Sequence, residues 1–181
     1  SGGGERPFTF AKEVVTWPAP SRFSEGDSIR LGERAKFTIL HAEAKAHPDP
    51  NQNSVVILVE LGATRLLLVG DAESGERRDP SYPPGDVEAF LIDHHKQSIR
   101  AHILQVGHHG SKTSSRRAFL DAVKPNIALV SSGPKRYGKT TLPDIEVIDA
   151  LKAVGAKILR TDERDADCPV SGRIGGDEGP G

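Results

Sequence analysis

The sequence has one cysteine, no methionine and no long apolar run. A single cysteine, Cys168, can form neither an internal disulfide nor a cysteine-rich zinc cluster, which suits a reducing compartment. No apolar stretch approaches the ~20 residues that a transmembrane helix requires. The start SGGGERP lacks the basic-then-apolar order of a signal peptide. We therefore expect a soluble, cytoplasmic protein with no membrane segment in this chain.

Neither sign of charge is in excess, since 24 lysines and arginines stand against 25 aspartates and glutamates. This balance gives no whole-chain argument for binding nucleic acid or a membrane surface, although a local basic patch remains open. Methionine is missing even at position 1, and both ends, SGGG and GRIGGDEGPG, are loop-like. We expect both ends to be cuts in a longer protein, so that residues 1–181 form one domain or its C-terminal portion.

Hydrophobic patterning predicts a mixed sheet faced by helices. The runs Ser54–Leu61 and Thr64–Val69 flank Gly62-Ala63 as in a β-hairpin, and their nearly continuous apolar character predicts that both faces are covered. From Leu104 onward, alternating strands and helices predict right-handed crossovers and parallel pairing. The other expected strands are Glu13–Trp17, Ser28–Leu31, Lys36–Ala42, Ala101–Val106, Asn126–Ser131 and Lys157–Arg160; the expected helices are Asp86–Ile99, capped by Asp86, Ser114–Val123 and Asp144–Val154.

Polar residues follow three of the predicted strands, in Gly70-Asp71, Gly107-His108-His109-Gly110 and Ser131-Ser132-Gly133. Ligands in sheet proteins bind beyond strand ends, where the chain turns away from a rigid scaffold. Aspartate oxygen and neutral histidine nitrogen are a mixture that suits zinc or manganese. Such a metal makes hydroxide available at neutral pH for hydrolysis. An ordinary turn carboxylate and a histidine pair in a polar turn remain the alternatives at this level.

The order of these motifs carries a resemblance. NSVVILVELGATRLLLVGDAE, then ILQVGHHGSKTSSRRAFLDAVKPNIALVSSG, then RYGKTTLPDIEVIDALKAVGAKILRTDE resemble the C-terminal half of the metallo-β-lactamase-fold domain in the ComEC family of DNA-uptake competence proteins and in their free-standing relatives. The match covers about residues 51–162, between loop-rich flanks at 1–35 and 165–181. The resemblance implies an α/β fold, an αββα sandwich of which this chain supplies a part, with a metal site along one edge of the sheets.

The resemblance also implies chemistry: hydrolysis of phosphodiester or other ester-like bonds with one or two zinc or manganese ions. Asp71 resembles the carboxylate that bridges two metals, and His108 resembles the last histidine ligand. His109 then takes part in catalysis beside the metal or contacts the substrate, although the two histidines could exchange roles. Three further residues are expected at the rim, where they would contact a phosphate: Ser111, Lys112 and Thr113.

Two departures from the family pattern limit this prediction. The cluster His-x-His-x-Asp-His is absent; His41 and His47 do not fit it, and His94-His95 lie on a predicted helix where we expect exposure to solvent. Tight zinc sites use at least three protein ligands, so we expect weak or absent metal binding by this chain alone. Lys139 stands where the family commonly has histidine; it could bind a phosphate as a point charge in the active site, or simply be solvated.

Two functions of different classes therefore stay open, beside a weaker third, a hydrolase of small esters, lactones or cyclic nucleotides on the same fold. The first is a metal-dependent phosphodiesterase or nuclease whose remaining ligands lie in sequence not present here. The second is a non-catalytic module on the same fold that binds nucleic acid or a protein partner. A small basic cluster of Lys112, Arg116 and Arg117 suits a phosphate-bearing substrate, but such clusters are usually solvated helix ends.

Overall fold

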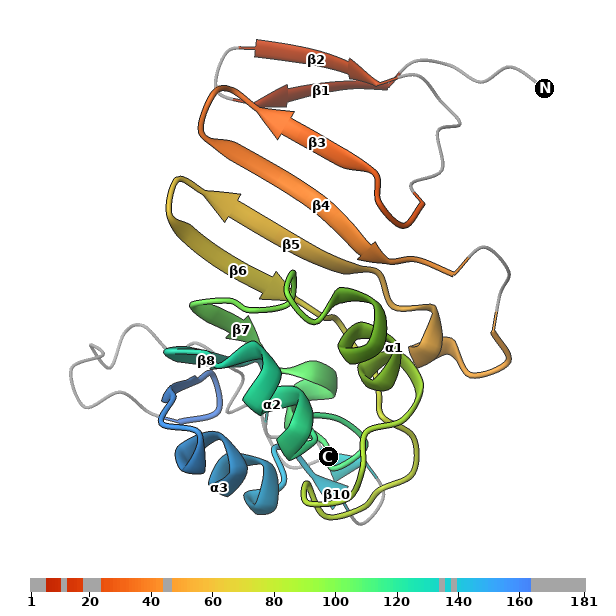
Figure 1. Cartoon of the computed structure of the whole chain (residues 1–181), viewed down its shortest axis with the longest axis vertical. Helices are drawn as coiled ribbons and strands as arrows, with labels where there is room; N and C mark the ends of the chain where they lie inside the picture. The colour runs from red at the N-terminus through yellow and green to blue at the C-terminus, as the bar shows by residue number, and fades with distance from the viewer. Residues whose placement is uncertain are drawn as a thin grey trace.

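Seven strands form one mixed sheet, in the order β11-β8-β7-β6-β5-β4-β3. The structure is a computed structural model that describes residues 6–10, 13–17, 24–43, 47–133, 136–137 and 140–163 (Figure 1). The sheet strands are β3 (Ser28–Leu31), β4 (Ala35–His41), β5 (Val56–Leu61), β6 (Thr64–Leu68), β7 (Ile103–Gln105), β8 (Ile127–Val130) and β11 (Lys157–Arg160). Two separate antiparallel pairs are β1 (Arg6–Phe10) with β2 (Glu13–Trp17), and β9 (Arg136–Tyr137) with β10 (Thr140–Thr141).

The pairing divides the sheet into two halves. Strands β3 to β6 form an antiparallel meander, whereas β6, β7, β8 and β11 pair in parallel. Each parallel step passes through a helix: α1 (Asp86–His95), α2 (Arg117–Val123) or α3 (Ile145–Ala153). The predicted hairpin and parallel half are confirmed. Because parallel strands point the same way, the chain leaves β6, β7 and β8 at one common edge of the sheet.

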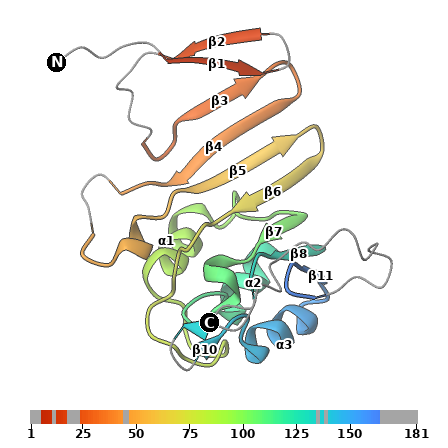
Figure 2. The same ribbon diagram turned by 180° about the vertical axis from the view of Figure 1, so that it is seen from behind.

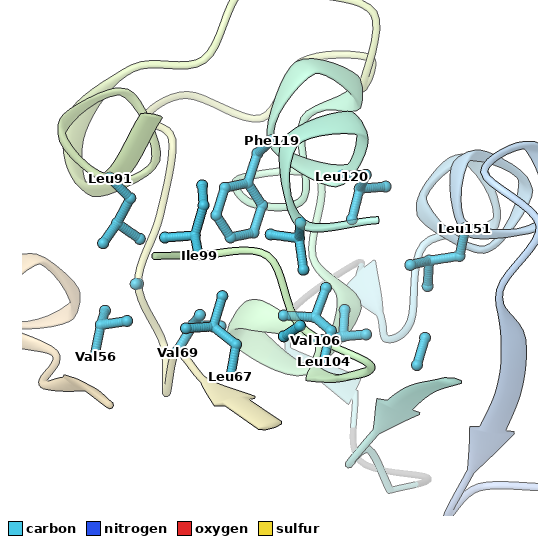
Figure 3. Packing of buried hydrophobic residues seen from close by; sticks show 14 of the residues in the cluster. Val56, Leu67, Val69, Leu91, Ile99, Leu104, Val106, Phe119, Leu120 and Leu151 are labelled. Carbon is cyan, nitrogen blue, oxygen red and sulfur yellow. The ribbon is translucent and has the colours of Figure 1, made fainter. Parts of the chain in front are cut away.

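The hydrophobic core lies between the sheet and the three helices. Successive right-handed crossovers in one direction place all three helices on the same face, as Figure 1 shows from the front and Figure 2 from behind. Figure 3 shows Leu91, Phe119, Leu120 and Leu151 packing down from the helices onto sheet residues such as Leu67. Each fully buried side chain of this size contributes roughly 1.5–3 kcal/mol.

The opposite face of the sheet is also apolar. The pairing register places Val59, Leu66, Ile103 and Ile127 in one row across four adjacent strands, and all four are half-buried. The apolar runs predicted two covered faces, but in the described part of the chain the helices cover only one. The described chain therefore has one sheet and one helical layer, which are half of the expected αββα sandwich.

Two helix starts differ from the prediction. Asp86 does not cap α1: Gly85 is the N-cap residue, and the Asp86 carboxylate accepts a hydrogen bond from Gln52 Nε2 at 2.9 Å. Helix α2 begins at Arg117 rather than Ser114, because Ser115 has a φ of 61° and the Ser114 hydroxyl donates to the Gly107 carbonyl at 2.7 Å. In both cases a tertiary contact overrides the local capping signal.

Within the described residues, no helix is long and apolar enough to cross a bilayer.

Candidate metal site

The ends of the neighbouring strands β6 and β7 bring Asp71, His108 and His109 together. The His108 amide donates to the Gly70 carbonyl at 3.1 Å, which joins the two turns directly after the strands. An open pocket of about 380 Å³ lies over this point. It is lined by Asp71, Arg77, His108, His109, Ser111, Thr140 and Leu142. The two motifs that the sequence singled out therefore share one pocket.

Gln105 fixes the turn that carries Asp71. Its Oε1 accepts from the amides of Val69 at 3.0 Å and Gly70 at 2.9 Å, while its Nε2 donates to the Val106 carbonyl at 2.9 Å. The side chain thus holds the end of β6 to the end of β7. Sequence reasoning missed this residue; its signal is one amide side chain within the apolar strand ILQV.

His109 presents one defined nitrogen to Asp71. Its Nδ1 lies 2.6 Å from the Ser131 carbonyl oxygen, which can only accept, so Nδ1 carries a proton. The other ring nitrogen, Nε2, lies 3.5 Å from Asp71 Oδ1. In a neutral imidazole, that places a nitrogen lone pair opposite a carboxylate. A proton or a metal cation between these two atoms would attract both of them.

His108 is held by a carboxylate and a hydroxyl. Its Nδ1 lies 2.6 Å from Glu73 Oε1 and 2.9 Å from Thr113 Oγ1. The Thr113 hydroxyl donates onward to Ser111 Oγ at 3.0 Å, so it accepts from the ring. The Glu73 side chain is only 7% exposed. These two acceptors beside Nδ1 place the proton on that nitrogen and leave Nε2 as the available ligand atom, as in many metal-binding histidines.

Both histidines have unusual backbone conformations. Their φ angles are 44° at His108 and 56° at His109, in the left-handed region that non-glycine residues avoid. Gly110 follows with φ 79°, and a Cβ there would lie 2.6 Å from Pro143 Cβ. Such strain costs about 1–3 kcal/mol per residue and is concentrated at functional sites. Both rings line the pocket, where His108 contacts Glu73 and His109 is bonded to the Ser131 carbonyl.

The predicted rim residues have different surroundings. Ser111 is buried and lines the pocket, while Thr113 holds His108. Lys112 Nζ pairs with Glu146 at 2.7 Å. Lys139 lies outside the residues that the structure describes. Contact of the first three with a phosphate stays a prediction.

The basic cluster is not a solvated helix end, because Arg116 is 1% exposed. Its guanidinium donates to the carbonyl oxygens of Glu76, Arg78, Asp79 and Lys112, at 2.5 to 3.2 Å. Arg116 therefore joins the loop after Asp71 to the loop after the histidines. The expectation of a solvated helix end was therefore wrong for Arg116. Arg117 is a surface residue that pairs with Asp121 at 3.0 Å.

Behind Arg116 lies a buried carboxylate, Glu88 of α1. It accepts the backbone amides of Ser115 and, at 3.1 Å, of Arg116. Burial raises the pKa of Glu88 to about 7, although these hydrogen bonds act in the opposite direction by stabilising the charged carboxylate. Glu88 anchors the segment behind the histidine motif from the helix side.

Arg77 was also missed by sequence reasoning. It comes from the polar loop after Asp71, and only the fold places it on the pocket wall. Its Nη1 donates to Ser111 Oγ at 3.0 Å, and its Nη2 lies 2.6 and 2.8 Å from the two carboxylate oxygens of Asp144. A permanent cation thus lines the same pocket as Asp71.

The donor types fit zinc or manganese, but their number does not close a site. Asp71 and His109 face each other, yet no set of three histidine, cysteine, aspartate or glutamate side chains among the described residues could hold one ion. Structural and catalytic zinc sites use at least three protein ligands. The described residues therefore form a candidate metal site that lacks a third donor.

Comparison with known proteins agrees with this fold. The chain is similar to ComE operon protein 3 of Bacillus subtilis, at 31% identity over 76% of this chain. It is also similar to competence protein ComA of Neisseria gonorrhoeae, at 33% identity over 70% of this chain, and to recombination protein 2 of Haemophilus influenzae, at 30% identity over 88%. The matched region spans only 16%, 16% and 19% of these relatives.

The family comparison covers most of the described sheet. The family model described as the metallo-beta-lactamase superfamily matches residues 5–133, which include Asp71, His108 and His109. The chain therefore belongs to the metallo-β-lactamase superfamily, and within it resembles the competence proteins of the ComEC type.

Proposed function

We propose that this chain carries part of the active site of a metal-dependent phosphodiesterase with nuclease-like activity. The observation that carries the proposal is the pair formed by His109 Nε2 and Asp71 Oδ1, 3.5 Å apart. The hydrogen bond from His109 Nδ1 to the Ser131 carbonyl leaves Nε2 without a proton in the neutral ring. A cation between these atoms satisfies both. One or two zinc or manganese ions are expected in the intact protein.

The residues have separate tasks in this proposal. Asp71 and His109 supply ligand atoms, and His108, oriented by Glu73, supplies another through Nε2. The remaining ligands come from outside the described residues. When bound, the metal supplies an activated water and stabilises negative charge that develops on a phosphate. Contacts of Lys112 and Lys139 with the phosphate remain part of the proposal; Lys112 Nζ also pairs with Glu146 at 2.7 Å.

Two observations support a phosphodiester substrate. The pocket combines the acidic Asp71 with the cationic Arg77, an arrangement that accommodates both a metal and an anionic group. Relatives named as competence and recombination proteins support nucleic acid as the source of the phosphodiester. The pocket lies beyond the ends of β6 and β7 and is open to solvent, which leaves room for an extended nucleic-acid strand.

Hydrolysis of a labelled oligonucleotide by the intact protein, with added zinc or manganese, tests the proposal. Asp71→Ala should abolish metal-dependent cleavage, because it removes one of the two facing donors. Asp149→Ala is the matched control, since Asp149 is an exposed carboxylate on α3 that pairs with Lys152 at 3.3 Å. An Asp71→Ala protein that cleaves as fast as the parent would overturn the proposal.

A non-catalytic binding module is the second candidate. It is favoured by the lack of a three-donor group in the described part of the chain. This alternative expects the intact protein to contain no stoichiometric metal and to bind an oligonucleotide equally well before and after chelation. Metal analysis together with a binding titration in EDTA separates the two functions.

A further inference from the structure

We propose that Arg77 forms an anion subsite on the wall of the pocket, where its guanidinium binds a phosphate group of the substrate. The identification of that phosphate with a phosphodiester rests on the proposed function. The anion binding itself rests on the position, charge and tethering of Arg77. It adds a substrate-binding residue from a loop that carries no motif.

The guanidinium is held in place by protein contacts that leave some of its N–H groups available to a ligand. Of its five N–H groups, one on Nη1 serves Ser111 and Nη2 serves Asp144. These contacts fix the plane of the side chain, while 38% of it remains exposed at the pocket. The planar fork of arginine matches two oxygens of a phosphate, and this pairing is stronger than a neutral hydrogen bond.

Asp144 pairs with Arg77 and offsets part of its charge. The Asp144 side chain is 12% exposed and that of Arg77 is 38% exposed, so the guanidinium is the member of the pair more accessible to an anion. Asp144 Oδ2 also accepts the backbone amide of Lys112 at 2.8 Å. The Asp144 carboxylate is therefore held by two donors. Among the described residues that line the pocket, Arg77 is the one permanent cation.

The loop that carries Arg77 is held firmly on both sides. The Ser74 amide donates to the Thr113 carbonyl at 2.6 Å, and the Arg78 amide donates to the Lys112 carbonyl at 3.3 Å. The buried Arg116 guanidinium holds the carbonyls of Glu76 and Arg78 from beneath. A donor held in place before the ligand arrives loses little entropy on binding. Arg77 is thus preorganised for an anion.

The subsite is tested by titrating the metal-free intact protein with inorganic phosphate in the presence of EDTA and measuring the heat of binding by calorimetry. Arg77→Gln should weaken phosphate binding about tenfold or more, because it removes a charge-assisted pair. Arg78→Gln is the matched control: Arg78 is the next residue, is 52% exposed and pairs with Glu76 at 2.6 Å, and it does not line the pocket. Its phosphate affinity should equal that of the parent.

A dinucleotide phosphodiester, titrated under the same conditions, distinguishes a diester site from a site for free phosphate. Weaker binding of the diester by Arg77→Gln, relative to Arg78→Gln, supports the substrate assignment; loss of phosphate binding without any loss of diester binding overturns it. Circular dichroism monitors folding, and if Arg77→Gln is unfolded, Arg77→Lys replaces it. The lysine keeps the charge without the fork, so it should bind both anions several-fold more weakly than the parent.

Equal phosphate affinities for the parent and both Arg77 variants would overturn the subsite, and so would equal losses at Arg77 and Arg78. These outcomes do not depend on hydrolysis, because no metal is present. A protein that binds phosphate through Arg77 but never cleaves an oligonucleotide keeps the subsite and removes the proposed phosphodiesterase. If the Arg77→Gln protein cleaves the oligonucleotide at the parent rate and binds phosphate with the parent affinity, the subsite is removed and the proposed phosphodiesterase is kept.

Discussion

Replacing Arg116 with methionine tests how the two loops of the site are held together. The side chain is 1% exposed and donates to four backbone carbonyls, two of which belong to Arg78 and Asp79. Methionine has a similar length but no donor, so these carbonyls lose a charged partner, and Glu88 loses the positive charge beside it.

The expected loss of stability follows from these contacts. Hydrogen bonds to a charged group contribute about 1.5–3 kcal/mol each, so four would sum to roughly 6–12 kcal/mol. Hydration of the freed carbonyls and the removal of a costly buried charge offset much of this sum. Removal of one member of a buried charged network typically costs about 3–5 kcal/mol, which we expect for Arg116→Met.

Urea unfolding followed by circular dichroism measures this loss. The control is Arg117→Met, the neighbouring residue, whose surface pair with Asp121 is worth about 0.3–0.5 kcal/mol. Arg116→Met should lower the unfolding midpoint strongly, and Arg117→Met should leave it almost unchanged. Similar midpoints for the two variants would refute the role given to Arg116.

Three further predictions concern the surroundings of the site. Glu73→Gln should weaken metal binding about tenfold, because removing the negative charge beside Nδ1 makes the His108 ring a less basic ligand; metal titration of the two proteins measures the difference, and equal affinities would contradict the prediction. Gln105→Leu should speed amide hydrogen exchange at Val69 and Gly70, whose N–H groups lose their acceptor; unchanged exchange would count against the clamp. The pKa of Glu88 is raised from 4.5 to about 7 in the folded protein, so the folded state binds the proton more tightly than the unfolded state. The free energy of unfolding of the parent, relative to that of Glu88→Gln, should therefore fall by about 3 kcal/mol as the pH rises from 4.5 to 7. Denaturant unfolding at several pH values measures this difference, and a difference that is flat or rises with pH would show the assignment to be wrong.

Much of the sheet could be predicted from local sequence. Strand Lys157–Arg160 was predicted with its observed bounds, and the hairpin at Gly62-Ala63 was placed correctly, because period and turn residues are local signals. Helix α2 was placed three residues too early, since the Ser114 hydroxyl binds Gly107, a contact that only the folded chain creates. Capping at Asp86 failed for the same reason.

The residues of the candidate site also differ in whether local sequence predicts them. Asp71, His108 and His109 could be grouped as candidates because each lies shortly after a strand, and parallel strands end at one edge. Arg77 could not, because it lies in a polar loop and is brought to the pocket by Asp144, 67 residues further along the chain. The burial of Arg116 likewise depends on four carbonyls from two loops and leaves no periodic signal.

Equilibrium binding of zinc or manganese to the intact protein tests the central claim most directly. The claim is that Asp71 and His109 hold the same cation, since Nε2 and Oδ1 face each other at 3.5 Å. Asp71→Ala and His109→Ala should each weaken binding at least tenfold, whereas His94→Ala, which changes an exposed histidine bonded to the Phe90 carbonyl at 3.0 Å, should not. Unchanged affinity in either the Asp71 or the His109 variant would contradict the account.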